Sequence, residues 1–117
     1  MKMAGTTKKA AEINAGLIRF HEASPDAINA FKALRKATCN DGGVVDFKTK
    51  ELIAIAVAVA RKCEPCIISH LEVGLQAGVS REELVEAVNI AILLCGGPGY
   101  AYAAKALEWY DDLVKGE

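Results

Sequence analysis

The sequence predicts an all-α protein, and three observations support this fold class. The 117-residue chain contains twenty alanines and only seven aromatic residues, a composition that favours closely packed helices over a β-sandwich. Apolar residues recur at helical spacing along much of the chain. Residue types that begin or end helices divide the chain into about six segments. The length suits one domain, residues 1–117, folded as a single compact bundle with a modest core.

The first half of the chain is expected to form three helices. The first covers residues 8–22, where the apolar positions follow helical spacing. Ser24 offers an N-cap for the second helix, and Pro25 occupies its first helical position. Residues 39–43 combine cysteine, asparagine, aspartate and two glycines, which indicates a loop. An aspartate then caps a third helix over residues 46–62.

The second half is expected to form three more helices. A fourth helix over residues 65–76 begins at a proline and is closed by a glycine two positions beyond it. Ser80 and Glu83 form a capping box, which begins a fifth helix that runs to about residue 95. The glycine- and proline-rich segment 96–99 then breaks the chain before a sixth helix.

Two of these segments, residues 53–60 and 84–94, are largely apolar around the whole helix. The first alternates large and small residues as a strand would, but its four alanines favour a helix. A helix that is apolar all round needs cover on every side, which a 117-residue monomer supplies with difficulty. We therefore predict a homo-oligomer associated through these helices. The alternative is that both helices occupy the centre of a six-helix bundle.

Charge and hydropathy exclude several classes of protein. Fourteen Lys and Arg residues against fifteen Asp and Glu residues give a net charge of -1, which argues against a dedicated nucleic-acid binder. A hydrophobic content of 52% with 25% charged residues excludes intrinsic disorder. The amino terminus lacks a signal-peptide pattern, and no apolar run reaches the roughly eighteen residues that span a bilayer. We expect a cytoplasmic protein without nucleic-acid or membrane partners.

The segment Cys63-Glu64-Pro65-Cys66 is the most informative part of the sequence. Two intervening residues allow the sulfur atoms to form a disulfide when the turn places them correctly. Pro65 indicates a helix start, so that Cys66 lies in the first turn, where amide groups and the helix dipole stabilise a thiolate. His70 lies one turn further on the same helix face. These residue types are typical of a thiol site that reacts with peroxides or disulfides.

Glu51 is the candidate fourth member of this site. If the chain reverses near Pro65, two helices form a hairpin and Glu51 returns toward His70, a suitable partner for a buried carboxylate. The alternative is an exposed first-turn glutamate beside Lys48 and Lys50.

Two other interpretations of the cysteine pair remain open at this stage. Cys63, Cys66 and His70 could bind zinc, with Glu51 or Cys39 as the fourth ligand. Only one ligand pair of the usual two is present, however. The two cysteines of the pair could also be buried and unreactive. Cys39, before the glycine-rich loop, and Cys95, at the end of an apolar helix, are expected to serve packing. Our leading interpretation needs neither a metal ion nor an organic cofactor.

Glu51, eleven residues, Cys63-x-x-Cys66, three residues and His70 form a pattern that resembles the alkylhydroperoxidase D signature. That family lies within the carboxymuconolactone decarboxylase-like superfamily, whose members are also similar in the segments corresponding to residues 74–84 and 96–99. The resemblance covers roughly residues 30–112. It implies an all-α fold assembled as trimers or hexamers, with antioxidant thiol chemistry.

The resemblance also implies a role for each residue of the signature. Cys66 would react with a hydroperoxide to form a sulfenic acid, and Cys63 would condense with it to a disulfide. Glu51 and His70 would form a proton relay through water. A dithiol or thioredoxin-like reductant would restore both thiols. Thioredoxin-type motifs use the first cysteine instead, so the order of attack stays open.

One position departs from the family pattern. Peroxidases of the family often have a histidine just before the second cysteine, where this chain has Pro65. Part of the relay is therefore missing, which makes a weaker peroxidase or a disulfide-exchange role an alternative within the thiol class. Lactone decarboxylation is the weaker enzymatic alternative, because the decarboxylase branch lacks the paired cysteines.

Overall fold

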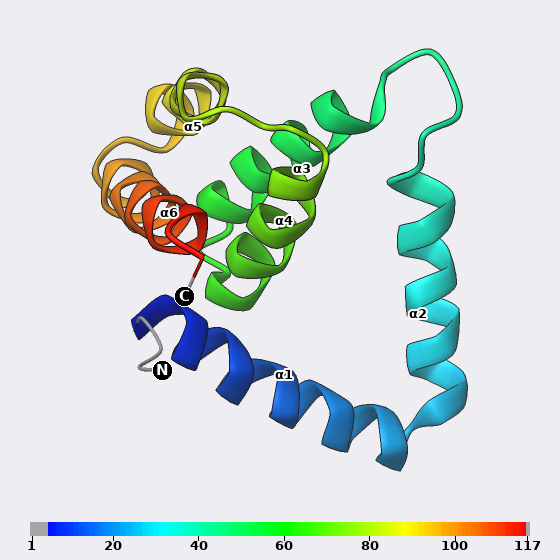
Figure 1. Cartoon of the computed structure of the whole chain (residues 1–117). Coiled ribbons are helices and arrows are strands. Elements are labelled where there is room, and N and C mark those ends of the chain that lie inside the picture. Colours follow the sequence, from blue (N-terminus) through cyan, green and yellow to red (C-terminus); the bar gives the residue numbers. More distant parts are fainter. Residues whose placement is uncertain (1–4, 117) are drawn as a thin grey trace.

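The structure is a computed structural model that describes residues 5–116, and it confirms the all-α class (Figure 1). Six helices and no strand occur within these residues. None of the six helices is both long and apolar enough to cross a lipid bilayer. The helices are α1 (Gly5–Ala23), α2 (Pro25–Thr38), α3 (Phe47–Ala60), α4 (Glu64–Gln76), α5 (Arg81–Cys95) and α6 (Gly97–Val114).

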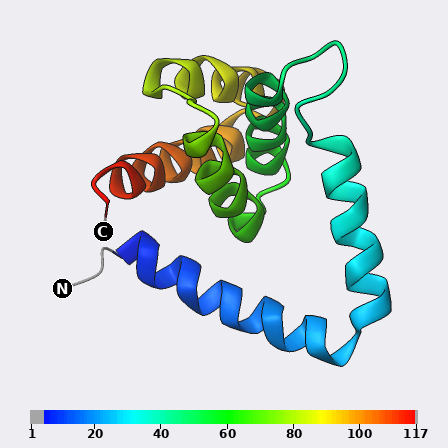
Figure 2. The same ribbon diagram turned by 45° about the vertical axis from the view of Figure 1, so that its right-hand side comes forward.

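Helices α3 to α6 pack against one another and form the core of the molecule (Figures 1 and 2). The largest fully buried apolar side chains all come from this bundle, namely Ile55, Val59, Ile67, Leu71 and Leu84. Helices α3 and α4 form a hairpin, which was one of the two arrangements the sequence left open, because three residues connect them and they pack side by side. This hairpin determines which side chains can meet at the site described below.

Local signals in the sequence account for most of the helix boundaries. The Asp46 side chain accepts a hydrogen bond of 2.7 Å from the backbone N–H of Thr49 at the start of α3. Ser80 and Glu83 form both hydrogen bonds of the predicted capping box at the start of α5. Ser24 occupies the N-cap position of α2, but its side chain makes no capping hydrogen bond within the described structure. Pro25 lies in the first turn of α2, so the helix begins there without a side-chain cap.

The glycine-rich segment 96–99 makes the predicted turn between α5 and α6. Gly96 has a φ of 65°, in the left-handed region that favours glycine. A Cβ atom on Gly99 would lie 2.8 Å from the carbonyl oxygen of Ala91, so the close crossing of α5 and α6 requires a glycine there. The segment therefore serves the packing of two helices.

Helices α1 and α2, which we call the arm, extend away from the bundle (Figures 1 and 2). Near its amino-terminal end, α1 buries Ala10, and the ammonium group of Lys9 lies 5.0 Å from the ring centroid of Trp109. Lys9 also forms an ion pair with Glu64 on α4. Helix α2 packs against α1 but against no other described helix, and none of its residues is buried. The bundle is thus a four-helix unit with a two-helix arm.

The two apolar helices of the bundle each leave one face uncovered. Ile53 and Val57 of α3 are each 54% exposed, and Leu93 and Leu94 of α5 are 80% and 77% exposed. The alternative that both helices lie at the centre of a six-helix bundle is therefore wrong, because the arm does not cover these faces. Apolar faces of this kind are what self-association requires, and the homo-oligomer stays a prediction.

Candidate active site

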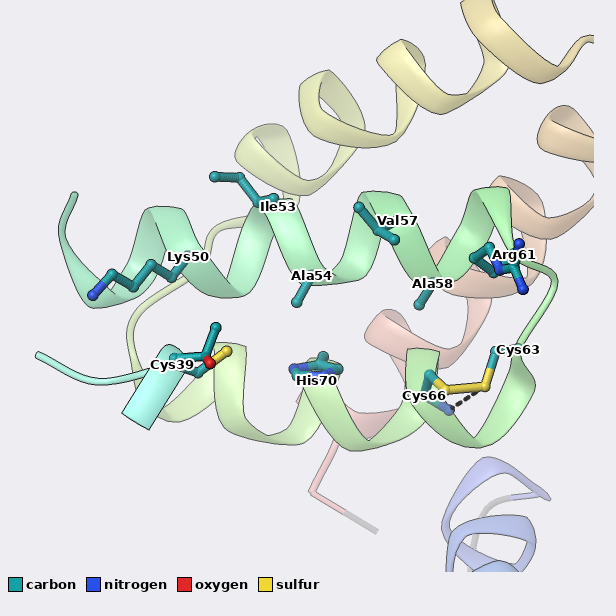
Figure 3. Close-up of a pocket in the computed structure, with 11 residues that line it drawn as sticks. Cys39, Lys50, Ile53, Ala54, Val57, Ala58, Arg61, Cys63, Cys66 and His70 are labelled. Carbon is teal, nitrogen blue, oxygen red and sulfur yellow. Dashed lines mark hydrogen bonds between the residues drawn. A yellow bond between two sulfur atoms is a disulfide. The ribbon is translucent and has the colours of Figure 1, made fainter. Parts of the chain in front are cut away.

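Cys63 and Cys66 are joined by a disulfide at the amino terminus of α4, with their Cα atoms 5.2 Å apart (Figure 3). Cys63 is the N-cap residue, and its sulfur accepts a hydrogen bond of 3.3 Å from the backbone N–H of Cys66 in the first turn. Cys63 is partly buried, whereas Cys66 is exposed. After reduction, both sulfur atoms lie where the amide groups and dipole of α4 stabilise a thiolate.

The structure brings Glu51 and His70 together across the α3–α4 hairpin. Oε1 of Glu51 lies 2.7 Å from Nδ1 of His70. Glu51 is fully buried, with an exposure of 0%, so the alternative of an exposed first-turn glutamate is wrong. An ionised carboxylate only accepts hydrogen bonds, and Nδ1 of His70 therefore carries the proton while Nε2 stays available as an acceptor. This arrangement gives the imidazole a defined tautomer and orientation.

Arg35 of α2 also contacts this histidine, although no pattern in the sequence points to it. Its Nη1 donates a hydrogen bond of 2.7 Å to Oγ of Ser69, and its Nη2 lies 3.2 Å from Nδ1 of His70. In the sequence, Arg35 resembles the neighbouring Lys32 and Lys36, which follow the polar face of an ordinary amphipathic helix. No local signal distinguishes it, because its partners lie more than thirty residues further along the chain.

Cys39, which the sequence analysis assigned to packing, lies at the same cavity as the disulfide and His70 (Figure 3). It is a free cysteine and is partly buried. Burial, and next the nearby Glu51 carboxylate, raise the pKa of the Cys39 thiol, against the opposing effect of Arg35 and Lys50. Cys39 is thus kept as a neutral thiol and differs in this respect from a cysteine at a helix amino terminus.

A cavity of about 630 Å³ lies along α3, and Cys39, the Cys63–Cys66 disulfide and His70 line it (Figure 3). Among the described residues, its lining contains two cations, Lys50 and Arg61, and no carboxylate. The ammonium group of Lys50 donates hydrogen bonds to the carbonyl oxygens of Asn40 and Gly42, which ties the 39–46 loop to α3. The lining residues are Thr38, Cys39, Lys50, Ile53, Ala54, Val57, Ala58, Arg61, Cys63, Cys66 and His70.

A second cavity, of about 450 Å³, lies on the arm side of the same residues. Cys66 and His70 line both cavities, while Phe31 and Leu34 of α2 contribute apolar walls to the second. Cys66 is therefore open to an apolar surface from two sides, and Cys63 from one. Such surroundings suit an organic substrate with an apolar part.

The described residues do not form the zinc site that the sequence left open. Among them, no group of three or more His, Cys, Asp or Glu side chains is placed to hold a metal ion. The sulfur atoms of Cys63 and Cys66 are bonded to each other, and the Glu51 carboxylate is directed at His70. Zinc binds thiolates, so the pair as it stands does not fit that ion.

The fold and the site together define an all-α protein with a cysteine pair at a helix amino terminus, beside a Glu–His pair. Comparison with known proteins identifies the family. The model of the carboxymuconolactone decarboxylase family matches residues 25–109, and the chain belongs to this family.

Two relatives illustrate the range of similarity in sequence. An uncharacterised protein of Cupriavidus necator is 40% identical over 102 residues, which cover 87% of this chain and 89% of that protein. Alkyl hydroperoxide reductase AhpD of Mycobacterium marinum is 35% identical over 63 residues. Those residues cover 54% of this chain and 35% of the reductase, so this chain is similar to only a part of that protein.

Solved structures of the family have the same fold. A family protein of Legionella pneumophila matches with a TM-score of 0.86 and 37% identity over 92% of this chain and 95% of that one. A family protein of Thermotoga maritima, described as a candidate for the antioxidative response, matches with a TM-score of 0.80 and 28% identity. This match covers 92% of this chain and 91% of the Thermotoga protein.

Proposed function

We propose that this protein is a thiol-dependent antioxidant oxidoreductase that reduces hydroperoxides or disulfides through Cys63 and Cys66. The main support is that this pair and His70 line one cavity, and that Oε1 of Glu51 accepts a hydrogen bond from Nδ1 of the imidazole. The similarity to an alkyl hydroperoxide reductase supports the same class of reaction. No organic cofactor is needed, because the sulfur atoms themselves gain and lose the electrons.

The first half of the proposed cycle oxidises the thiol pair. Cys66 is the exposed member, and its thiolate attacks the terminal oxygen of a hydroperoxide. The O–O bond breaks, the departing alkoxide takes up a proton and leaves as an alcohol, and Cys66 becomes a sulfenic acid. The sulfur of Cys63 then attacks that of Cys66, which forms the disulfide and releases the hydroxyl group as water.

His70 and Glu51 manage the protons of this reaction. Nε2 of His70 accepts the thiol proton of Cys66, through a water molecule, and returns it to the alkoxide. Glu51 accepts a hydrogen bond from Nδ1 and stabilises the ring while it is charged. Pro65 replaces the second histidine that family peroxidases often have, so we expect slower peroxide reduction than in those enzymes.

The second half of the cycle restores the thiols. A dithiol or thioredoxin-like reductant attacks one sulfur of the disulfide, forms a mixed disulfide, and is itself oxidised to a disulfide when its second thiol attacks. If the substrate is a disulfide instead of a hydroperoxide, the reduced cysteine pair attacks it by the same kind of exchange. The substrate is then reduced to thiols, and the pair is oxidised to the Cys63–Cys66 disulfide. Because the cycle consumes reduced thiols, we place the protein in the cytoplasm.

The experiment that tests this function is mass spectrometry of the intact reduced protein after brief treatment with stoichiometric alkyl hydroperoxide. Denaturing alkylation and peptide mapping then locate the remaining free thiols. We expect loss of two thiols and a Cys63–Cys66 disulfide. In Cys63→Ser a sulfenic acid accumulates on Cys66, Cys66→Ser does not turn over, and Cys95→Ser serves as the control. Four alkylatable thiols after treatment would refute the proposal.

The family description makes lactone decarboxylation the second candidate function. Lys50 and Arg61 at the cavity give it some support, because a substrate of that class carries carboxylates. The two candidates differ in their need for sulfur. A decarboxylase keeps its activity in the double variant Cys63→Ser, Cys66→Ser and after thiol alkylation, whereas a thiol oxidoreductase loses it completely.

A further inference from the structure

The contact between the arm and the candidate active site consists of a few polar groups. Helix α2 packs only against α1 among the described helices, and none of its residues is buried. Among the described residues, one hydrogen bond joins α2 to α4, from Nη1 of Arg35 to Oγ of Ser69, and Nη2 of Arg35 lies beside His70. We propose that Arg35 is a positioning residue of the thiol site, which holds the Glu51–His70 pair in its reactive arrangement from the arm. This inference rests on the proposed function.

The geometry around one ring nitrogen defines what Arg35 does. Nδ1 of His70 lies 2.7 Å from Oε1 of Glu51 and 3.2 Å from Nη2 of Arg35. A ring nitrogen has either a proton or a lone pair, so it cannot donate to the carboxylate and accept from the guanidinium at once. The shorter contact to a fully buried carboxylate indicates donation from Nδ1 to Glu51. Arg35 then acts on the pair as a neighbouring cation.

The buried carboxylate explains why a cation is needed there. Oε2 of Glu51 is buried and has no hydrogen-bond partner within the described part of the chain. A buried charge is costly unless opposite charge offsets it. Lys50 is the other cation nearby, but its ammonium group is bound to oxygens of the 39–46 loop. Arg35 therefore offsets the charge of Glu51 on the side where the imidazole lies.

Ser69 fixes the orientation of the guanidinium. Nη1 of Arg35 donates to Oγ of Ser69 at 2.7 Å, which directs Nη2 at the neighbouring His70. Because a guanidinium is planar and rigid, the hydrogen bond that fixes Nη1 also restricts the position of Nη2. A lysine at this position would bring the charge without the second contact. Arg35 thus links the position of α2 to the orientation of the imidazole that moves the proton.

Single-turnover kinetics of thiol oxidation test this role. Reduced Arg35→Ala, Arg35→Lys and wild-type protein are mixed with alkyl hydroperoxide, and the Cys63–Cys66 disulfide is quantified over time. We expect Arg35→Ala to react about tenfold to a hundredfold more slowly than wild type, with little change in the peroxide concentration at half-maximal rate. Arg35→Lys is expected to lie between them. Lys36→Ala, which removes the neighbouring exposed cation, is expected to react like the wild type.

Chemical rescue separates positioning from folding. Added guanidinium at a concentration far below its denaturing range is expected to restore part of the rate of Arg35→Ala and to leave the wild type unchanged. A wild-type rate in Arg35→Ala would overturn the inference while the proposed function stands. A loss of rate that guanidinium does not restore, together with a lower melting temperature, would assign Arg35 to folding and also overturn it. If wild-type protein forms no disulfide, the proposed function itself fails.

Discussion

Oε1 of Glu51 lies 2.7 Å from Nδ1 of His70, although nineteen residues separate them in the sequence. Glu51 comes from the second turn of α3 and His70 from the middle of α4, and the hairpin between these helices brings them together. The contact joins a fully buried carboxylate to an imidazole that lines the same cavity as the cysteine pair. A buried carboxylate of this kind is poorly explained by stability alone, because a well-packed apolar residue would cost less. Its presence favours a role in proton transfer.

Replacing the carboxylate by an amide tests this role directly. In Glu51→Gln the side chain keeps its shape but loses its charge, so it stabilises a charged imidazole less. We expect the rate of thiol oxidation by hydroperoxide to fall about a hundredfold, the scale of a single acid–base contribution. The melting temperature should change little. Glu86→Gln on the exposed face of α5 is the matched control, and equal rates in the two variants would contradict the relay.

How much of this site the sequence predicts depends on how far apart its members lie. The helix starts at Asp46 and Ser80 depend on residues three positions away, and the sequence predicted both caps correctly. The pairing of Glu51 with His70 was one of two interpretations that the sequence left open, and the three-residue connection between α3 and α4 makes the hairpin that brings them together. Arg35 was missed, since its meeting with His70 depends on the path of a whole two-helix arm.

Cys39 shows the same limit in another way. Its residue type and its place before a loop suggested packing, and the sequence contains no spacing that relates it to the thiol pair. Its place at the cavity follows from where α2 ends relative to α3, which is a property of the tertiary structure. The exposed faces of α3 and α5 agree with the expectation that one chain cannot cover both apolar helices, although apolar periodicity alone does not distinguish cover by the arm from cover by another molecule.

The alkylation rate of Cys39 should depend on Glu51. Burial and the Glu51 carboxylate raise the pKa of the Cys39 thiol, so at a given pH it contains less thiolate than an ordinary cysteine. Its reaction with iodoacetamide should therefore increase at a higher pH than that of a free thiol in a peptide. In Glu51→Gln the negative charge is gone, and this rise should move to lower pH. Peptide mapping after timed alkylation measures both profiles, and identical profiles would contradict this account.

The Glu64 carboxylate should make the attachment of the arm sensitive to acid. Its contacts with Lys105 and Lys9 lower the pKa of Glu64 below its usual value of 4.5. The ionised carboxylate therefore stabilises the folded state fully at a pH above 4.5, the usual pKa. This stabilisation is lost as the pH falls through the lowered pKa of the folded state. We expect a contribution of about 1 kcal/mol or less, because these are partly exposed ion pairs.

Chemical denaturation between pH 3 and pH 7 measures this contribution. The difference in unfolding free energy between wild type and Glu64→Gln should be largest near pH 7 and vanish at the acid end. Glu86→Gln, on an exposed position of α5, serves as the control and should show no such dependence. A difference that grows toward low pH would show that the ionised Glu64 carboxylate does not stabilise the folded state.

The uncovered apolar face of α5 should hold copies of the chain together. Leu93 and Leu94 are 80% and 77% exposed, and burying one leucine contributes about 1.5–3 kcal/mol. We expect light scattering after size exclusion to give a mass several times the 12.4 kDa of one chain. Leu93→Asp, which would place a charge in the contact, should shift that mass toward the monomer. Val44→Asp changes an equally apolar but fully exposed loop residue and should leave the mass unchanged, whereas a monomeric wild type would refute the prediction.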